Sequence, residues 1–243
     1  MTGDRAGHSP QRYARAAGVL YLVIIVLGLS AELLVRSALV VPGDAAATAR
    51  HVLASPGLFR AGFVADSVMF LADVALAVLL YVLLKPVSPV LALVTMCFRL
   101  AQSAVLASNL LHYHAALLLL AAPGPAGAFS AEQLGSLAAF FLDLHAHGYD
   151  LGLLLFGMHC LVLGYLVFRS GYLPRALGVL LAGAGLAYLV GSYTRFLFPD
   201  HVASVAPIYM VAIVAEVSMC LWLLLRGVDP AAWTRAARGR ASH

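Results

Sequence analysis

The feature that most constrains this chain is a series of apolar segments, each long enough to cross a lipid bilayer as a helix of about 20 residues. The predicted spans are residues 16–35, 61–84, 90–120, 145–168, 177–198 and 203–225. Only 11% of the 243 residues are charged, less than half of the roughly 25% typical of soluble domains. We therefore expect an all-α polytopic transmembrane helical bundle. A disordered chain, a secreted disulfide scaffold and a nucleic-acid-binding domain are excluded.

The basic residues predict how the spans are oriented. One side of the predicted bundle carries Arg5, Arg12, Arg15, Lys85, Arg169, Arg175, Arg226, Arg235, Arg238 and Arg240, and the other carries Arg36, Arg50, Arg60 and Arg195. The positive-inside rule places the richer side, and with it both termini, in the cytoplasm. The expected domains are a basic cytoplasmic N-terminus over 1–15, a single six-helix membrane domain over 16–226 and a basic cytoplasmic tail over 227–243.

The external connections carry helix-capping signals. Asp44 is expected to cap a short interfacial helix that ends near Leu53. In the second connection, Pro123-Gly124-Pro125 breaks the third helix, and Ser130 with Gln133 forms a capping-box pattern. The fourth helix therefore starts outside the membrane, and its length would be about 57 Å at 1.5 Å per residue.

Nearly every predicted span contains an ionisable side chain. These residues are Glu32, Asp66, Asp73, Arg99, His112, His114, His145, Asp150, His159, Arg195 and Glu216. A charge at the centre of a membrane helix costs roughly 2.5–3.5 kcal/mol on insertion scales. We therefore expect these side chains to face the bundle interior, to pair with one another or to be protonated.

Spacing places the polar residues of the second and third spans on shared faces. Asp66 and Asp73 are two helical turns apart and point the same way. Arg99, Gln102 and Asn109 fall in one stripe of the third span, and Arg99 is the natural counter-ion for Asp73 or for Glu216 of the last span. Two interpretations stay open for Arg99: an ion pair that fixes helix registry, or part of a proton or substrate relay. Glu216 either pairs with Arg99 or stays protonated.

The fourth span begins with a cluster of histidines and acids. His145 shares a face with Tyr149, and Gly148 with Gly152 on this face predicts the close approach of another backbone. His112 of the third span is expected at a similar depth to His145. A metal or haem site would take one histidine from each helix and an acid, from the set His112, His145, Asp66 and Asp150. The alternative is interfacial histidines held by hydrogen bonds.

Several segments of the chain resemble a known family. They are Phe63-Val64-Ala65-Asp66 leading to Asp73, Tyr81-Val82-Leu83-Leu84-Lys85-Pro86-Val87, Leu144-His145 to Tyr149, Ser170 to Gly178, and Glu216 to Leu224. From about Tyr13 to Val228 the sequence resembles the bacterial membrane-protein family called domain of unknown function 4386. The resemblance implies a multi-pass bacterial membrane protein, which we expect in the cytoplasmic (inner) membrane. It supports the acid of the second span, His145 and Glu216 as family features. It implies no activity.

Three functions remain open from the sequence. The first is a small-ligand or ion binding or transport module with a polar intramembrane cavity open to the external side. Its expected ligand-binding residues are Asp66, Asp73, Arg99, Gln102, Asn109, His145, Tyr149 and Glu216. The second is an intramembrane metal- or haem-dependent enzyme, and the third is a structural or regulatory membrane protein. No catalytic residue, cofactor or ligand is assigned, and the expected partners are the lipid bilayer and a second copy of the chain in a homodimer.

Overall fold

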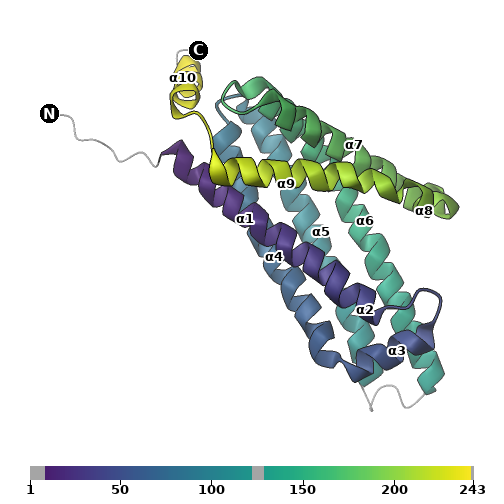
Figure 1. Ribbon diagram of the computed structural model, residues 1–243. Coiled ribbons are helices and arrows are strands. Elements are labelled where there is room, and N and C mark those ends of the chain that lie inside the picture. Colours follow the sequence, from purple (N-terminus) through teal and green to yellow (C-terminus); the bar gives the residue numbers. More distant parts are fainter. Residues whose placement is uncertain (1–8, 122–128, 242–243) are drawn as a thin grey trace. The chain divides into compact units, whose positions relative to one another are not determined.

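A computed structural model describes residues 9–121 and 129–241 of the chain. Across these residues the chain forms helices and no strand (Figure 1), and six of its helical segments are long and apolar enough to cross a membrane. The segments are Pro10–Leu39, Pro56–Leu84, Pro89–Ala121, Ala131–Ser170, Arg175–Leu197 and Pro199–Leu225. The six predicted spans and the all-α membrane bundle are therefore confirmed. The Pro123-Gly124-Pro125 break lies outside the described residues.

The long helices are α1 (Pro10–Ser30), α4 (Pro56–Leu84), α5 (Pro89–Ala121), α6 (Ala131–Ser170), α7 (Arg175–Leu197) and α9 (Tyr209–Leu225). A π-helical turn, η1 (Ala31–Arg36), and the short α2 (Ser37–Leu39) continue α1. The remaining elements are α3 (Ala45–Ala54), η3 (Pro199–His201), α8 (Val202–Val205), η4 (Ala206–Ile208) and α10 (Pro230–Ala241).

The last span differs from the regular helix predicted over 203–225. Short turns of 3-10 and α-helix lead from Pro199 to Ile208, and the continuous helix α9 begins only at Tyr209. Pro199 and Pro207 explain the difference, because proline lacks the N–H that a helix interior needs.

Both predicted helix caps are confirmed. The Asp44 carboxylate accepts a hydrogen bond from Ala47 N at 2.7 Å and starts α3. Ser130 N donates to Gln133 Oε1 at 2.7 Å, and Gln133 N donates to Ser130 Oγ at 3.2 Å. This reciprocal pair begins α6, the longest helix of the described chain, with 40 residues.

The chain divides into two compact units. The first unit comprises Met1–Leu22, Ala72–Gln102 and Leu153–His243, and the second comprises Val23–Leu71 and Ser103–Gly152. Helices α1, α4, α5 and α6 contribute residues to both units. The single membrane domain expected over 16–226 stays a prediction.

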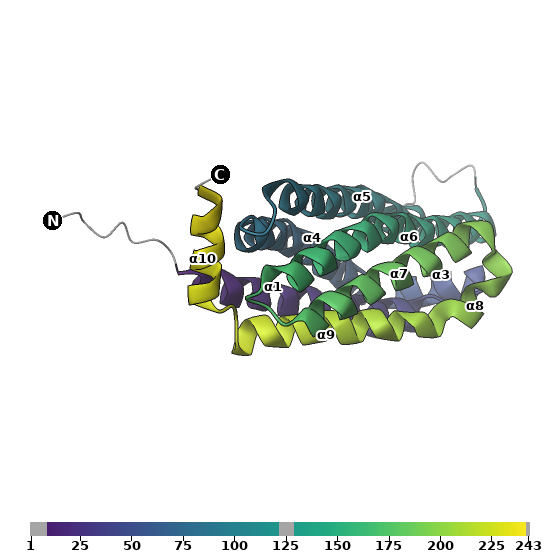
Figure 2. The ribbon, with the colours of Figure 1, turned by 90° about the horizontal axis from the view of Figure 1, so that it is seen from above.

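In the first unit, glycines allow α6 and α7 to pack closely. A Cβ built on Gly164 would lie 2.6 Å from the carbonyl oxygen of Gly178, and one built on Gly185 would lie 2.7 Å from that of Gly157. The two glycines of each helix are seven residues apart and so fall on one face. Figure 2 shows α7 running between α6 and α9. The backbones of α6 and α7 are therefore in direct contact.

In the first unit, hydrogen bonds also join the start of α1 to the residues that follow α9. Gln11, in the first turn of α1, donates from Nε2 to Arg226 O at 2.7 Å and accepts at Oε1 from Val228 N at 3.0 Å. Trp233 of α10 donates from Nε1 to Leu83 O at 2.9 Å. The start of α1 and the end of α9 thus lie on the same side, as an even number of spans requires.

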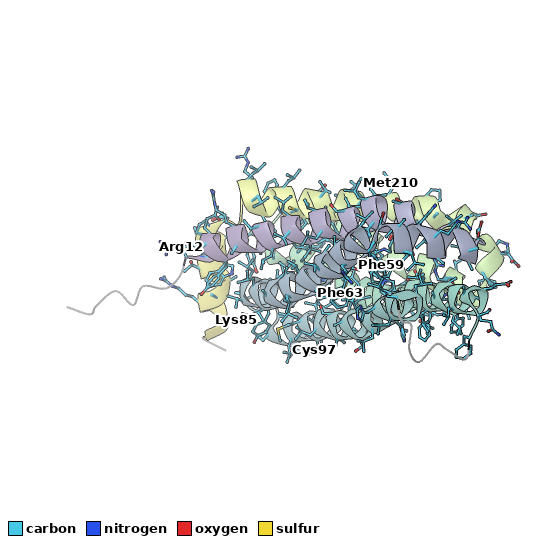
Figure 3. All side chains as sticks on the ribbon, turned by 90° about the horizontal axis from the view of Figure 1, so that it is seen from below. Arg12, Phe59, Phe63, Lys85, Cys97 and Met210 are labelled. Carbon is cyan, nitrogen blue, oxygen red and sulfur yellow. The ribbon has the colours of Figure 1, made fainter. Side chains whose placement is uncertain are left out.

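The second unit has an aromatic centre joining α4 to α5. The Phe59 and Tyr113 rings stack with centroids 4.0 Å apart, and the Tyr113 hydroxyl donates to Phe59 O at 3.1 Å. Phe63, labelled with Phe59 in Figure 3, lies one turn further along α4 and contacts the His114 ring at 5.5 Å. Apolar side chains surround this centre, among them Val35, Leu39, Val52, Met69, Phe70, Leu106, Leu110, Leu117 and Leu142.

Candidate functional site

A buried ion pair joins α4 to α5 in the first unit. Arg99 Nε donates to Asp73 Oδ1 at 2.8 Å, and Arg99 Nη2 bonds the same oxygen. Both residues are buried, with 0% and 3% of their surface exposed. The rings of Tyr21 and Phe156 lie 5.2 and 5.1 Å from the guanidinium carbon. Of the two counter-ions that the sequence allowed for Arg99, the structure therefore shows Asp73.

His159 completes the environment of Arg99, and its bonding fixes its tautomer. Its Nε2 lies 3.0 Å from Arg99 Nη1 and must accept, because a guanidinium has only donors. The proton is therefore on Nδ1, which lies 2.9 Å from Thr95 O and donates to it. The Thr95 hydroxyl in turn donates to His159 O at 3.0 Å. The imidazole is thus neutral and has both ring nitrogens bonded.

Gln102 bonds the second oxygen of Asp73. With the amide nitrogen turned toward the acid, Nε2 donates to Asp73 Oδ2 at 2.8 Å and to Arg99 O at 3.3 Å. We call Asp73, Thr95, Arg99, Gln102 and His159 the closed cluster. No buried nitrogen or oxygen of Asp73, Arg99 or His159 is left without a partner. A fully bonded network of this kind fixes how α4, α5 and α6 pack in this unit.

Glu216 bonds a different residue from Arg99, the partner that the sequence analysis allowed. The Tyr188 hydroxyl donates a hydrogen bond to Glu216 Oε1 and so links α7 to α9. The Tyr188 ring meets the Phe156 ring edge-on at 5.2 Å. A phenol donor lowers the cost of placing this carboxyl in an apolar helix, since a buried acceptor without a partner is costly.

In the second unit, Arg36 bridges two acids. Its Nη1 donates to Asp66 Oδ2 at 2.8 Å, and its Nε donates to Glu32 Oε2 at 2.6 Å. The Asp66 side chain is fully buried, that of Arg36 is 15% exposed, and that of Glu32 is 63% exposed. The guanidinium carbon lies 5.9 Å from the centre of the Tyr149 ring. Glu32 and Arg36 both lie in the π-helical turn η1, a rare geometry that is frequent at functional sites.

Asn109 joins two histidines in the same unit. Its Nδ2 donates to His145 O at 2.7 Å, and its Oδ1 accepts from His112 Nδ1 at 2.9 Å. His145 Nδ1 also contacts Asn109, at 3.1 Å from Nδ2 and 3.2 Å from the carbonyl oxygen. His112 and His145 therefore come together as predicted, but through an amide.

The glycines of α6 make room for this arrangement in a way the sequence did not predict. A Cβ on Gly148 would lie 2.9 Å from Asn109 Nδ2, and one on Gly152 would lie 2.6 Å from Leu106 Cδ2. The expected close approach of another backbone at Gly148 and Gly152 is therefore wrong. Side chains of α5 fill the space instead, because Asn109 and Leu106 lie over the two glycines.

Three polar atoms, one each of Arg36, Asp66 and His145, make no hydrogen bond within the described residues. Asp66 Oδ1 and His145 Nε2 are buried without a hydrogen-bond partner. Arg36 Nη2 makes no hydrogen bond to the described part of the chain. The Tyr149 ring, which borders Arg36, is also 6.4 Å from the His145 ring. We call Arg36, Asp66, Asn109, His145 and Tyr149 the open cluster.

The eight predicted ligand-binding residues divide between the two units. The first unit contains Asp73, Arg99, Gln102 and Glu216, and the second contains Asp66, Asn109, His145 and Tyr149. Sequence reasoning gave no site role to Arg36, which it used only to orient the spans, or to His159. The four-residue spacing of Glu32 and Arg36 was the available signal for an ion pair.

The proposed metal ligands do not form a metal-binding group. Within residues 9–121 and 129–241, no three histidine, cysteine or acidic side chains are placed to hold a metal ion. Asp66 pairs with Arg36, His112 and His145 bond Asn109, and Asp150 is buried in α6. The metal or haem interpretation gains no support from this geometry.

The fold and these clusters define a multi-pass α-helical membrane protein with polar side chains buried among its spans. Residues 16–227 match the family described as Domain of unknown function (DUF4386), so the chain belongs to that family. An uncharacterized protein of Archaeoglobus fulgidus is 31% identical over 155 residues, which are 64% of this chain and 76% of that protein. No solved structure matches the chain.

Proposed function

We propose that this protein binds a small polar ligand or ion at the open cluster and acts as a binding or transport module. The observation that carries the proposal is the pair of buried, unpartnered atoms Asp66 Oδ1 and His145 Nε2. Leaving a buried polar atom unpaired costs about 1–3 kcal/mol. A bound ligand would supply the missing hydrogen-bond partners of these atoms and so explain why they are buried.

The closed cluster supports the choice of the second unit as the binding site. Asp73 and Arg99 are as deeply buried as Asp66, yet all their buried polar atoms are bonded within the protein. This favours a structural role for Asp73, Arg99 and Gln102 and a binding role for Asp66, Asn109, His145 and Tyr149.

The proposal includes an orientation and an assembly. The positive-inside distribution supports an external position for Arg36 and Arg60, and we therefore propose that the ligand enters from the external side. Six spans are few for an independent transporter, and we therefore expect a homodimer. Crosslinking in native membranes tests this assembly.

Thermal unfolding of detergent-purified protein tests the binding site. The probes are ammonium, choline, glycerol, glycine, L-alanine, L-lactate and succinate. A ligand at a hundred times its Kd stabilises the folded state by about 2.7 kcal/mol, which raises Tm by roughly 5–10 °C in a chain of this size. We expect at least one probe to do so in the wild type and not in His145→Asn, which keeps a polar atom near Nδ1 and removes Nε2.

The matched control is His51→Asn, because His51 is exposed on α3 and lies outside the open cluster. This variant should respond like the wild type. A probe response that His145→Asn retains, or no response to any probe, would contradict the proposal. Stoichiometric metal or a haem absorbance band in the purified protein would also contradict it and favour an enzyme with a histidine and carboxylate site.

A further inference from the structure

The Arg36 guanidinium forms hydrogen bonds within the protein through only two of its three nitrogens. Its Nε binds Glu32 and its Nη1 binds Asp66, while Nη2 makes no hydrogen bond within the described residues. Guanidinium presents its N–H groups as a planar fork that suits the two oxygens of a carboxylate. Arg36 therefore offers a further donor for an anionic group.

Glu32 is the displaceable partner of Arg36. Its side chain is 63% exposed, whereas that of Asp66 is fully buried. An ion pair whose acid is exposed to solvent contributes little to stability, so exchanging the Glu32 carboxylate for another carboxylate costs little. Exchanging Asp66 would instead leave a buried acid without its cation, which is far more costly.

The charges of the open cluster favour a ligand that carries both a negative and a positive charge. Arg36 carries one positive charge, and Asp66 with a carboxylate at the Glu32 position carries two negative charges. One negative charge is therefore in excess, and Asp66 Oδ1 has no hydrogen-bond donor. An ammonium group would supply both the missing donor and the missing charge.

We propose that the ligand of the open cluster is a small zwitterionic amino acid. Arg36 binds its carboxylate in place of Glu32, and Asp66 Oδ1 binds its ammonium group. His145 Nε2 lies in the same unit, with the Tyr149 ring next to both His145 and Arg36, and it bonds a further polar atom of the ligand. This inference rests on the proposed function, because it names the ligand of the same site.

Binding isotherms with glycine and L-alanine test the proposal, with acetate, methylamine and glycerol as partial mimics. In the wild type we expect both amino acids to bind at least tenfold tighter than any mimic, because each mimic lacks a charged group and one charged hydrogen bond is worth roughly 1.5–3 kcal/mol. Glu32→Gln should tighten amino-acid binding about threefold or more by removing the competing carboxylate. Arg36→Lys should weaken it at least tenfold by losing the fork.

Glu132→Gln is the matched control for Glu32→Gln, since Glu132 is exposed in the first turn of α6. It should bind like the wild type, and the Tm of each ligand-free variant checks folding. If glycerol, acetate or methylamine binds as well as the amino acids and depends on His145, the ligand class is wrong and the proposed site stands. If no compound binds in a His145-dependent way, both proposals fail.

Discussion

Asp73 and Arg99 form an ion pair with both side chains buried, and each has further partners inside the protein. Arg36 and Asp66 form a second pair in which only Asp66 is fully buried, and here each side chain keeps a polar atom without a hydrogen bond to the described residues. The same residue types therefore serve two purposes in one chain. In the proposed function, the closed pair stabilises the packing of helices and the open pair binds the ligand.

Asp73→Asn tests the structural role of the closed cluster. Removing one member of a buried pair leaves the other charge uncompensated and typically costs about 3–5 kcal/mol. We expect Tm of the purified protein to fall by about 10 °C or more. The double variant Asp73→Leu with Arg99→Met should recover part of this loss, because it removes both charges. If Asp73→Asn instead keeps the wild-type Tm and loses the ligand-induced shift, the Asp73 and Arg99 pair takes part in ligand binding and not in packing.

Gly148→Ala tests the placement of Asn109. The added methyl group would overlap the Asn109 amide, which holds His112 and His145. We expect destabilisation by about 1–3 kcal/mol, measured by thermal unfolding, together with weaker ligand binding. Gly57→Ala is the control, because a Cβ there meets nothing within 4 Å. Equal Tm values for the two variants would show that Asn109 does not lie over Gly148.

Gly164→Ala tests the contact between the α6 and α7 backbones. A Cβ at this position would lie 2.6 Å from Gly178 O and 2.7 Å from Ala182 N, and backbone atoms cannot move aside as a flexible side chain can. We expect a loss of about 3 kcal/mol or failure to accumulate in the membrane. Gly183→Ala, whose nearest neighbour would be 3.4 Å away, should be tolerated. Similar expression and Tm for both variants would contradict the packing.

Tyr172→Phe tests a bond in the turn between α6 and α7. The Tyr172 hydroxyl donates to Leu83 O at 2.7 Å, and burial raises the pKa of this phenol above its usual value near 10. A raised pKa in the folded state means that its stabilising effect is complete below pH 10 and is lost as the pH rises further. We expect the substitution to cost about 1 kcal/mol at pH 7.

The pH dependence separates this bond from a packing effect. Between pH 10 and 11 the free energy of unfolding should fall less steeply in Tyr172→Phe than in the wild type, as measured by denaturant titration. Identical slopes would show that Tyr172 does not ionise differently in the folded and unfolded protein.

The sequence predicted features that depend on local spacing. The Asp44 cap and the Ser130 and Gln133 capping box follow from the chemistry of helix ends. The cost of burying charge predicted an acidic partner for Arg99 but left Asp73 and Glu216 both open, and the structure shows Asp73. The exact neighbours of His159 could not be predicted, because helical periodicity gives the face of a residue and not the element opposite it.

Arg36 shows a second limit of sequence reasoning. Its position depends on a π-helical turn over Ala31–Arg36, in which each N–H bonds five residues back instead of four. Such a turn changes the direction of every later side chain in the helix, and no composition or spacing rule reveals it. From the sequence, Arg36 is therefore only a basic residue that helps to orient the spans.

Thermal unfolding of His145→Asn and Asp73→Asn, each with and without the probes, tests whether the ligand binds at the open cluster. We expect His145→Asn to keep a Tm close to the wild type and to lose the ligand-induced shift. Asp73→Asn should have a lower Tm and keep that shift. A lower Tm with a retained shift in His145→Asn, and a wild-type Tm with a lost shift in Asp73→Asn, would contradict the proposed site. That result would place the ligand at the closed cluster and give the open cluster a structural role.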